Sequence, residues 1–209
     1  MDLPDDIALR FAVCEAAADP PLDVLSAEER ARLSGFGSAK RRREFALGRD
    51  VARRLLAEQV GTPPEAVSLR VAEDGAPETE TGHLSIAHAS TDDRTLAAAA
   101  VSPLPVGVDL EVVRPRRPDL YRRILHPDEH GLIETLPFEH DAAQVLVWTL
   151  KEAALKAMRT GFRVSPQALR FVVPPFEGMA VLRHEGALWD LQFAEVEGCF
   201  VAVAFGTAP

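Results

Sequence analysis

Cysteine is scarce in this sequence of 209 residues. Cys14 and Cys199 are its only cysteines, and they lie near opposite ends with no partner at the spacing of a metal site. Small secreted domains use many cysteines to form disulfides, whereas proteins of reducing compartments keep a few free thiols. We therefore expect reduced thiols and a cytoplasmic protein.

Long apolar runs are also missing. No stretch approaches the roughly 18 residues that a membrane-spanning helix needs. The first residues include Asp2, Asp5 and Asp6, and they lack the basic segment followed by an apolar run that marks a signal peptide. We expect neither a membrane protein nor an exported one.

Positive charge is in deficit, because 23 Lys and Arg face 32 Asp and Glu, for a net charge of −9. This balance argues against general affinity for nucleic acid or for membrane surfaces, which both attract basic proteins. The basic residues that remain are clustered, which suggests local anion sites. The first basic group is Lys40, Arg41, Arg42, Arg43, Arg49, Arg53 and Arg54, and the second is Arg114, Arg116, Arg117, Arg122 and Arg123.

Two long helical patterns, at residues 38–60 and 141–159, indicate the fold class. Gly61 and Pro63 end the first pattern, and Gly161 ends the second. Strand-like runs follow each helix, at residues 67–71, 83–87, 95–101 and 106–110, and then at 170–173, 179–183, 188–194 and 199–205. The alternation predicts an α+β fold.

Because helix and strands occur in the same order twice, we expect two similar halves, residues 1–104 and 105–209. Each would be a long helix on a small, mainly antiparallel sheet. Ligand sites often lie in the cleft between such halves, so we expect the active site there. Shorter helices are expected to start at Ser26, with Glu29 three residues later, and at Pro127.

The segment 107–111 reads Gly-Val-Asp-Leu-Glu. On a strand, Asp109 and Glu111 project to one side while Val108 and Leu110 face the core. Neighbouring carboxylates repel each other unless a cation lies between them, and Mg²⁺ prefers such oxygen ligands. The alternative is a strand end that carries two solvated acids.

The segment 148–156 reads Trp-Thr-Leu-Lys-Glu-Ala-Ala-Leu-Lys. At about 3.6 residues per turn, Trp148, Glu152 and Lys156 stand above one another on one helix face. Glu152 and Lys156 could be a surface ion pair worth roughly 0.3–0.5 kcal/mol. The large aromatic on the same face favours a helix that lines a cleft.

A third segment, residues 84–90, places His88 after a short strand. Such a histidine can donate to a phosphate or satisfy a turn carbonyl. His126 and His130 stand four residues apart like a zinc pair, but no further ligand pattern accompanies them.

Together these segments resemble the surfactin-synthetase-activating type of 4′-phosphopantetheinyl transferase. That family carries a Gly-x-Asp-x-Glu strand and a Trp-x-x-Lys-Glu-x-x-x-Lys helix, and both are intact here. Upstream it carries a Ser-x-Ser-His-Ser strand end, which corresponds to residues 85–89, and an Arg-rich helix with a glycine, which corresponds to the region around Gly48. The resemblance spans nearly the whole chain.

The resemblance implies an enzyme that moves the phosphopantetheine arm of coenzyme A to a serine of an acyl or peptidyl carrier protein. Adenosine 3′,5′-bisphosphate is the other product, and Mg²⁺ is the cofactor. Carriers of polyketide, nonribosomal-peptide, siderophore and fatty-acid synthesis all fit. Since both halves stand on one chain, we expect a monomer, with no nucleic-acid or membrane partner.

The family's roles carry over to matching residues. Asp109, Glu111 and Glu152 would bind the metal, Glu152 would also serve as general base, and Lys156 would reach a phosphate oxygen. Catalysis would thus rest on Asp109, Glu152 and Lys156. Residues that would contact or position coenzyme A are Arg32, Arg43, Arg49, Gly75, His88, Lys151 and Lys156.

Two departures from the family pattern concern coenzyme A. The family often has Gly-Lys-Pro near the adenine, whereas Ala76 follows Gly75 here, and alanines replace the serines on both sides of His88. None of these positions takes part in the reaction itself, so we expect altered coenzyme A binding and retained activity.

Two other functions compete with transfer. A catalytically silent relative would bind coenzyme A or a carrier as a scaffold, and a different metal enzyme could cleave phosphates with Asp109 and Glu111. The second basic group has two interpretations as well. It could receive the acidic surface of a carrier protein, or it could merely solvate a loop that contains Pro115 and Pro118.

Overall fold

A computed structural model describes residues 1–160 and 163–206 of the chain. The fold is α+β, as the sequence predicted. The chain divides into two compact units. One, here the N-terminal unit, is Asp5–Pro103, and the other, here the C-terminal unit, combines Leu104–Pro209 with Met1–Pro4.

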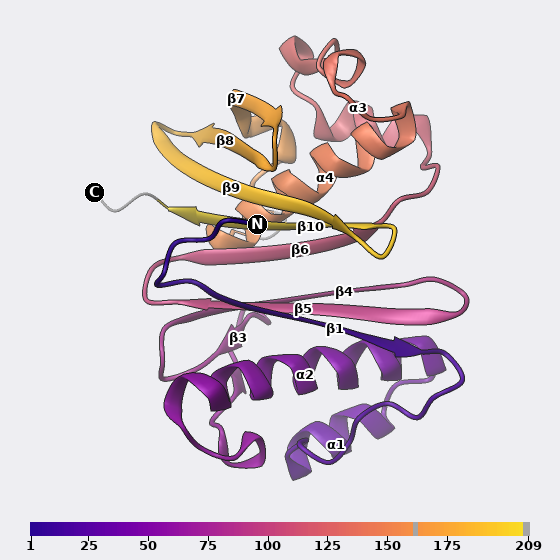
Figure 1. Cartoon of the computed structure of the whole chain (residues 1–209), viewed down its shortest axis with the longest axis vertical. Helices are drawn as coiled ribbons and strands as arrows, with labels where there is room; N and C mark the ends of the chain where they lie inside the picture. Colours follow the sequence, from indigo (N-terminus) through magenta and orange to yellow (C-terminus); the bar gives the residue numbers. More distant parts are fainter. Residues whose placement is uncertain (161–162, 207–209) are drawn as a thin grey trace. The chain divides into compact units, whose positions relative to one another are not determined.

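The N-terminal unit is an antiparallel sheet with a long helix across one face (Figure 1). Among the described residues the strand order is β1-β5-β4, where β1 is Ala8–Glu15, β4 is His83–Ser90 and β5 is Arg94–Ser102. The helix α2 is Ala39–Val60, and the shorter α1 is Ala27–Ser34. Short pieces complete the unit: the 3₁₀ turn η1 (Pro64–Ala66), β2 (Arg70–Val71) and β3 (Pro77–Glu78).

Local signals fix the ends of these helices. Ser26 and Glu29 form the predicted capping box of α1. Ser38 accepts from Arg41 N at the start of α2, and Gly61 ends that helix in the left-handed conformation that glycine adopts without strain, with φ 68°. Apolar residues of α2 such as Leu55 then pack on small residues of β5 to form the core of the unit.

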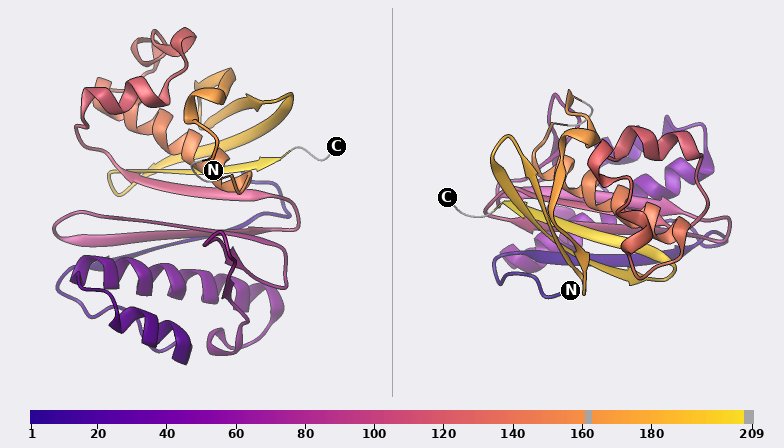
Figure 2. Two further views of the ribbon diagram at one scale, coloured as in Figure 1. Left: turned by 180° about the vertical axis from the view of Figure 1, so that it is seen from behind. Right: turned by 90° about the horizontal axis from the view of Figure 1, so that it is seen from above.

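The C-terminal unit is a larger antiparallel sheet covered by α4, His140–Ala157 (Figure 2). Within the described chain its order is β6-β10-β9-β8-β7. The strands are β6 (Val106–Val112), β7 (Arg170–Phe176), β8 (Met179–His184), β9 (Ala187–Val196) and β10 (Cys199–Gly206). Between β6 and α4 lie α3 (Pro118–Ile124), η2 (Pro127–Glu129) and η3 (Ile133–Thr135), and η5 (Pro166–Ala168) precedes β7. Leu146, Leu150 and Phe200 are central to its core.

The elements differ from the sequence prediction in several places, including helix α3 and strand β3, which were not predicted. Strand β1 was not predicted, yet it pairs along its whole length with β5, from Ala8 with Val101 to Glu15 with Arg94. The run expected at residues 67–71 is reduced to β2, and the helix start at Pro127 is a 3₁₀ turn. Helix α4 ends at Ala157, and Gly161 lies outside the described residues.

The second basic group does not lie in a single loop, which one of its two interpretations required. Pro118 begins helix α3, and Arg122 and Arg123 lie in the last turn of this helix. Both arginines are exposed.

No helix in residues 1–160 and 163–206 combines the length and the apolar character required to cross a membrane.

Candidate functional site

Strand β6 and helix α4 bring the two predicted motifs together, and Gly107 sets their distance. A Cβ atom at Gly107 would lie 2.0 Å from Ala153 O and 2.4 Å from Ala157 N. The strand therefore touches the helix backbone at a point where only glycine fits. Because side chains alternate along a strand, Asp109 and Glu111 project to the same side as Gly107, toward α4.

Asp109 is buried, with 7% of its surface exposed. Lys156 Nζ donates to Asp109 Oδ1 at 2.7 Å and to the carbonyl oxygen of Val108 at 3.1 Å. The second carboxylate oxygen, Oδ2, is buried and accepts no hydrogen bond from the described part of the chain. Asp109 thus has one oxygen that accepts a hydrogen bond and one oxygen without a hydrogen-bond partner in the described chain.

Glu111 is held by two donors. Trp148 Nε1 donates to Oε1 at 3.0 Å, and Arg116 Nη2 donates to Oε2 at 2.5 Å. Burial raises the pKa of the Glu111 carboxyl, and the charge of Asp109 raises it further, while Arg116 and the Trp148 hydrogen bond act in the opposite direction. The predicted strand motif therefore contacts the predicted helix motif at this residue.

Glu152, one turn from both Trp148 and Lys156, is half-buried. Burial raises its pKa to about 7, with Asp109 and Glu111 adding to the shift and Lys156 opposing it. Its Oε1 is buried and lacks a hydrogen-bond partner among residues 1–160 and 163–206. A carboxyl that titrates near neutrality suits a general base.

These carboxylates suit a divalent cation. Asp109 Oδ2 and Glu152 Oε1 are buried acceptors without partners, which is unfavourable unless a ligand satisfies them. Carboxylate oxygens are also the ligands that Mg²⁺ prefers. In the described residues, however, no group of three or more His, Cys, Asp or Glu side chains is already gathered as a metal site. Lys156 and Arg116 instead neutralise Asp109 and Glu111.

Lys151 lies in the interior, with 0% of its surface exposed. Its Nζ donates to Glu129 Oε2 at 2.5 Å and to the carbonyl oxygen of Ile124 at 3.0 Å. Burial lowers the pKa of Lys151, and Glu129 opposes this. The enclosed side chain has no exposed surface through which to contact coenzyme A directly.

Sequence reasoning did not find Glu129. Its carboxylate also accepts from the backbone N–H groups of His126, at 3.0 Å, and Phe171, at 2.9 Å. It therefore ties together α4, η2 and β7. The signal that could have found it is the capping pattern of η2, in which Glu129 reaches back to the N-cap residue His126.

The N-terminal unit gathers arginines around Phe45 on α2. The guanidinium carbon of Arg32 lies 5.6 Å from the ring centre, and that of Arg49 lies 5.3 Å from it. Arg49 Nη1 and Arg43 Nε are buried and have no hydrogen-bond partner within the described chain. The cluster therefore combines positive charge with N–H groups that have no partner, and this combination suits the binding of an anion.

Glu29 connects this cluster to α1. It pairs with Arg53 at 2.9 Å and lies 3.7 Å from Arg49 Nε. Burial lowers the pKa of the Arg49 guanidinium; Glu29 opposes the shift, and Arg32 and Arg53 add to it. Arg53 also donates to the carbonyl oxygens of Pro64 and Val67, so it serves the fold of the unit.

His88 lies on β4 beside α2. A Cβ on Gly48 would lie 3.9 Å from the His88 ring, and His88 Nδ1 lies 3.9 Å from a carboxylate oxygen of Glu44. Gly75 belongs to the exposed turn between β2 and β3, where its φ is 84°. The structure thus gathers Arg32 and Arg49 on one ring, and places His88 on a neighbouring strand of the same unit.

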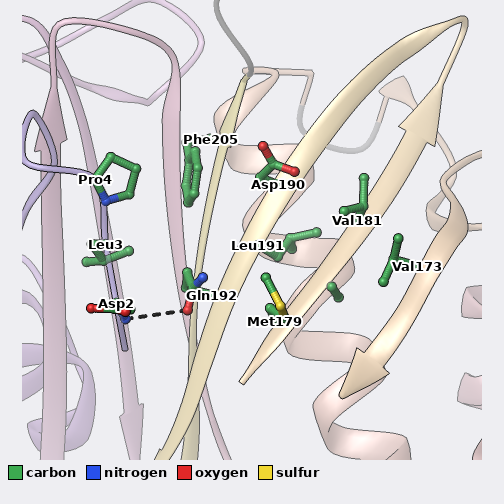
Figure 3. Close-up of a pocket in the computed structure, with 11 residues that line it drawn as sticks. Asp2, Leu3, Pro4, Val173, Met179, Val181, Asp190, Leu191, Gln192 and Phe205 are labelled. Atoms are coloured by element: carbon green, nitrogen blue, oxygen red, sulfur yellow. Dashed lines mark hydrogen bonds between the residues drawn. The ribbon is translucent and has the colours of Figure 1, made fainter. Parts of the chain in front are cut away.

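A pocket of about 420 Å³ lies elsewhere in the C-terminal unit (Figure 3). Leu3, Met179, Val181 and Phe205 line it, and Asp2 N donates to Gln192 at 3.4 Å beside it. Its lining contains none of the site residues expected from the sequence.

Comparisons with known proteins agree with the motifs. Residues 105–203 match the model of the 4′-phosphopantetheinyl transferase superfamily. The chain is 31% identical over 198 residues to the 4′-phosphopantetheinyl transferase HetI of Nostoc sp. (strain PCC 7120), a match that covers 88% of this chain and 81% of HetI. It is also 26% identical over 141 residues to the 4′-phosphopantetheinyl transferase psf-1 of Bacillus pumilus, covering 66% of this chain and 59% of psf-1.

Proposed function

Because the chain belongs to the 4′-phosphopantetheinyl transferase superfamily, we propose that it transfers the 4′-phosphopantetheine arm of coenzyme A to a serine of an acyl or peptidyl carrier protein. Adenosine 3′,5′-bisphosphate leaves in this reaction. The observation that carries the proposal is the meeting of the two motifs at β6 and α4. There Asp109 and Glu111 act electrostatically on Glu152, and Asp109 Oδ2 and Glu152 Oε1 are buried without a hydrogen-bond partner in the described chain.

The arginine cluster of the N-terminal unit binds the 3′-phosphate of coenzyme A in this proposal. Arg43 and Arg49 offer buried N–H groups that a phosphate would satisfy, and Arg32 lies beside Arg49 on the Phe45 ring. Hydrogen bonds between guanidinium groups and phosphate are charge-assisted and therefore strong. His88 adds a donor from β4.

Asp109, Glu111 and Glu152 would hold the Mg²⁺ ion. A bound magnesium would neutralise charge that develops on the pyrophosphate. Lys156, which in this structure donates to Asp109, would also donate to a phosphate oxygen of coenzyme A. Because these groups are buried or half-buried, the effective dielectric around them is low, and each charge interaction between them is stronger than in water.

Glu152 accepts the proton of the carrier serine, directly or through a water. The serine oxygen forms a bond to the phosphorus next to the pantetheine arm, and the bond from that phosphorus to the leaving oxygen of adenosine 3′,5′-bisphosphate breaks. A pKa of about 7 leaves a large fraction of Glu152 ionised at neutral pH while keeping it basic enough to take a proton.

The test is incubation of the protein with coenzyme A, Mg²⁺ and an apo carrier domain, followed by intact-mass measurement of the carrier. We expect a mass gain equal to one phosphopantetheine arm, and its loss when the metal is chelated. A panel of carriers from polyketide, nonribosomal-peptide and fatty-acid systems should be measured under matched conditions.

Other outcomes would point to the competing functions. Binding of coenzyme A without any mass gain on every carrier would indicate a silent relative. Cleavage of coenzyme A at the pyrophosphate without a carrier would indicate a different phosphate-cleaving metal enzyme. Either result would contradict the proposed transfer.

A further inference from the structure

The carboxylate of Glu111 is fixed by two donors that differ in kind. Trp148 lies on helix α4 and offers one rigid N–H, which donates to Oε1 at 3.0 Å. Arg116 lies after the end of β6, before α3 begins, and donates to Oε2 at 2.5 Å. Each oxygen of this predicted metal ligand thus has a donor of its own.

Trp148 can keep its hydrogen bond while Glu111 binds a metal. An indole N–H carries no net charge, so it does not repel a cation, and it leaves Oε2 available. Its ring packs against the buried cluster around Tyr121 and Val147, so the position of the donor is set by the core. Outer partners of this kind orient a ligand, and their loss commonly lowers metal affinity by about 10- to 100-fold.

Arg116 cannot play the same part. Its guanidinium is a permanent positive charge beside the oxygen that a metal would take, and like charges so close repel strongly when partly buried. Its side chain is only 22% exposed, but the residue belongs to no helix or strand, so nothing in the secondary structure prevents its movement.

We propose that Trp148 and Arg116 act on Glu111 in opposite ways. Trp148 is a positioning residue that holds Glu111 in the orientation for the divalent cation, and Arg116 is a counter-cation that occupies Glu111 until the divalent cation displaces it. The inference rests on the metal role of Glu111 in the proposed function, and it adds residues to which the sequence motifs assign no such role.

The experiment measures Mn²⁺ binding to the protein alone, through the electron paramagnetic resonance signal of free Mn²⁺. Trp148→Phe keeps an aromatic ring and removes the N–H, and it should weaken binding by about tenfold. Arg116→Gln removes the competing charge, and it should tighten binding by at least about threefold. A purely structural role would not move the two variants in opposite directions.

Matched controls come from the same unit. Trp189→Phe makes the same chemical change on β9, and Arg117→Gln removes one charge from the exposed neighbour of Arg116. Both should leave Mn²⁺ affinity within about twofold of the wild type, because neither contacts Glu111 in the described structure. Circular dichroism checks that all variants remain folded.

The outcomes separate the inference from the proposed function. If Asp109→Asn abolishes Mn²⁺ binding but Trp148→Phe and Arg116→Gln bind as the wild type does, the metal site stands and the inference is wrong. If only the Arg116→Gln variant binds Mn²⁺ with the wild-type affinity, the counter-cation role of Arg116 is wrong. If the wild type binds no Mn²⁺, the metal part of the proposed function fails, and the inference fails with it.

Discussion

Lys156 reaches from α4 to the strand and donates to Asp109 Oδ1 at 2.7 Å, while the other oxygen of the same carboxylate stays buried without a donor from the described residues. One oxygen of Asp109 is therefore neutralised by a cation of the chain, and the other would gain a partner from a bound ligand. This asymmetry is the reason why we expect the residue to matter for activity more than for folding.

Asp109→Ala should abolish transfer and change the free energy of unfolding by no more than about 1 kcal/mol. The variant loses the ion pair with Lys156, but Lys156 is one-third exposed and can be solvated, and the repulsion with Glu111 and Glu152 is relieved. Carrier mass spectra and urea unfolding check the two parts. Near-wild-type transfer with magnesium present would show that the metal assignment is wrong.

The pKa shift of Glu152 predicts how stability depends on pH. The folded protein holds this proton up to a pKa of about 7, whereas the ordinary value is 4.5. Between these values the folded state binds more protons than the unfolded state, so the free energy of unfolding falls as pH rises. Glu111 is shifted in the same direction and adds to the effect.

Glu152→Gln should therefore flatten the melting temperature as a function of pH between about 4.5 and 7, and it should lower turnover by about 10²-fold. Thermal melts without metal, across that pH range, check the first part. Glu195→Gln, at an exposed position on β9, is the control and should keep the wild-type slope. A wild type whose stability rises over this range would contradict the shift.

Dephospho-coenzyme A should bind more weakly than coenzyme A by about 10- to 100-fold, since charge-assisted hydrogen bonds to the 3′-phosphate would be lost. Arg43→Ala and Arg49→Ala should shrink that difference, as measured by calorimetry of both ligands. Arg70→Ala, which removes an exposed arginine paired with Glu80 in the same unit, should preserve it. Equal affinity of the wild type for both ligands would mean that the arginine cluster has another role.

Gly107→Ala should lower the free energy of unfolding by about 3 kcal/mol, because the added methyl meets backbone atoms that cannot rotate away. Gly131→Ala is the control in the same unit, where a Cβ would have no atom of the described structure within 4 Å, and its effect should stay within about 1 kcal/mol. Chemical denaturation measures both. If the Gly107→Ala protein is as stable as the control, the strand and the helix can move apart without a loss in the free energy of unfolding.

The exposed members of the second basic group are predicted to receive the carrier protein. Arg117 and Arg122 are exposed, whereas Arg116 is paired with Glu111, so the double variant Arg117→Ala/Arg122→Ala tests the patch. We expect a higher KM for the carrier with a weaker salt dependence, and an unchanged KM for coenzyme A, since rim charges act mainly on association. Arg183→Ala, an exposed change on β8, is the control. Unchanged carrier kinetics at low salt would place docking elsewhere.

The sequence was sufficient for the features that depend on local chemistry. Helical periodicity placed Trp148, Glu152 and Lys156 on one face, and the structure shows Trp148 and Lys156 contacting Glu111 and Asp109. The capping box at Ser26 follows from residues three apart. The helix face and the capping box could be predicted because each relates residues that lie within about two turns of one helix.

Features set by distant pairing were beyond the sequence. Strand β1 has no regular alternation of buried and exposed residues, and its partner β5 begins about eighty residues later, so its pattern alone did not reveal it. The family resemblance implied that Lys151 contacts or positions coenzyme A. A helix turns by about 100° per residue, however, and this turn takes Lys151 into the core, where its partner Glu129 lies 22 residues away in sequence.

The buried contact of Lys151 with Glu129 also affects how relatives of this chain are to be classified. Two adjacent residues of one motif have different roles: Lys151 anchors the helix to Glu129, whereas Glu152 is the general base in the proposed function. A paralogue that keeps Lys151 and Glu129 but has lost Glu152 should fold as this protein does and transfer at least about 10²-fold more slowly. Genome surveys that score the motif as a whole would count such a chain as an enzyme, whereas scoring the two letters separately would identify it as a pseudoenzyme.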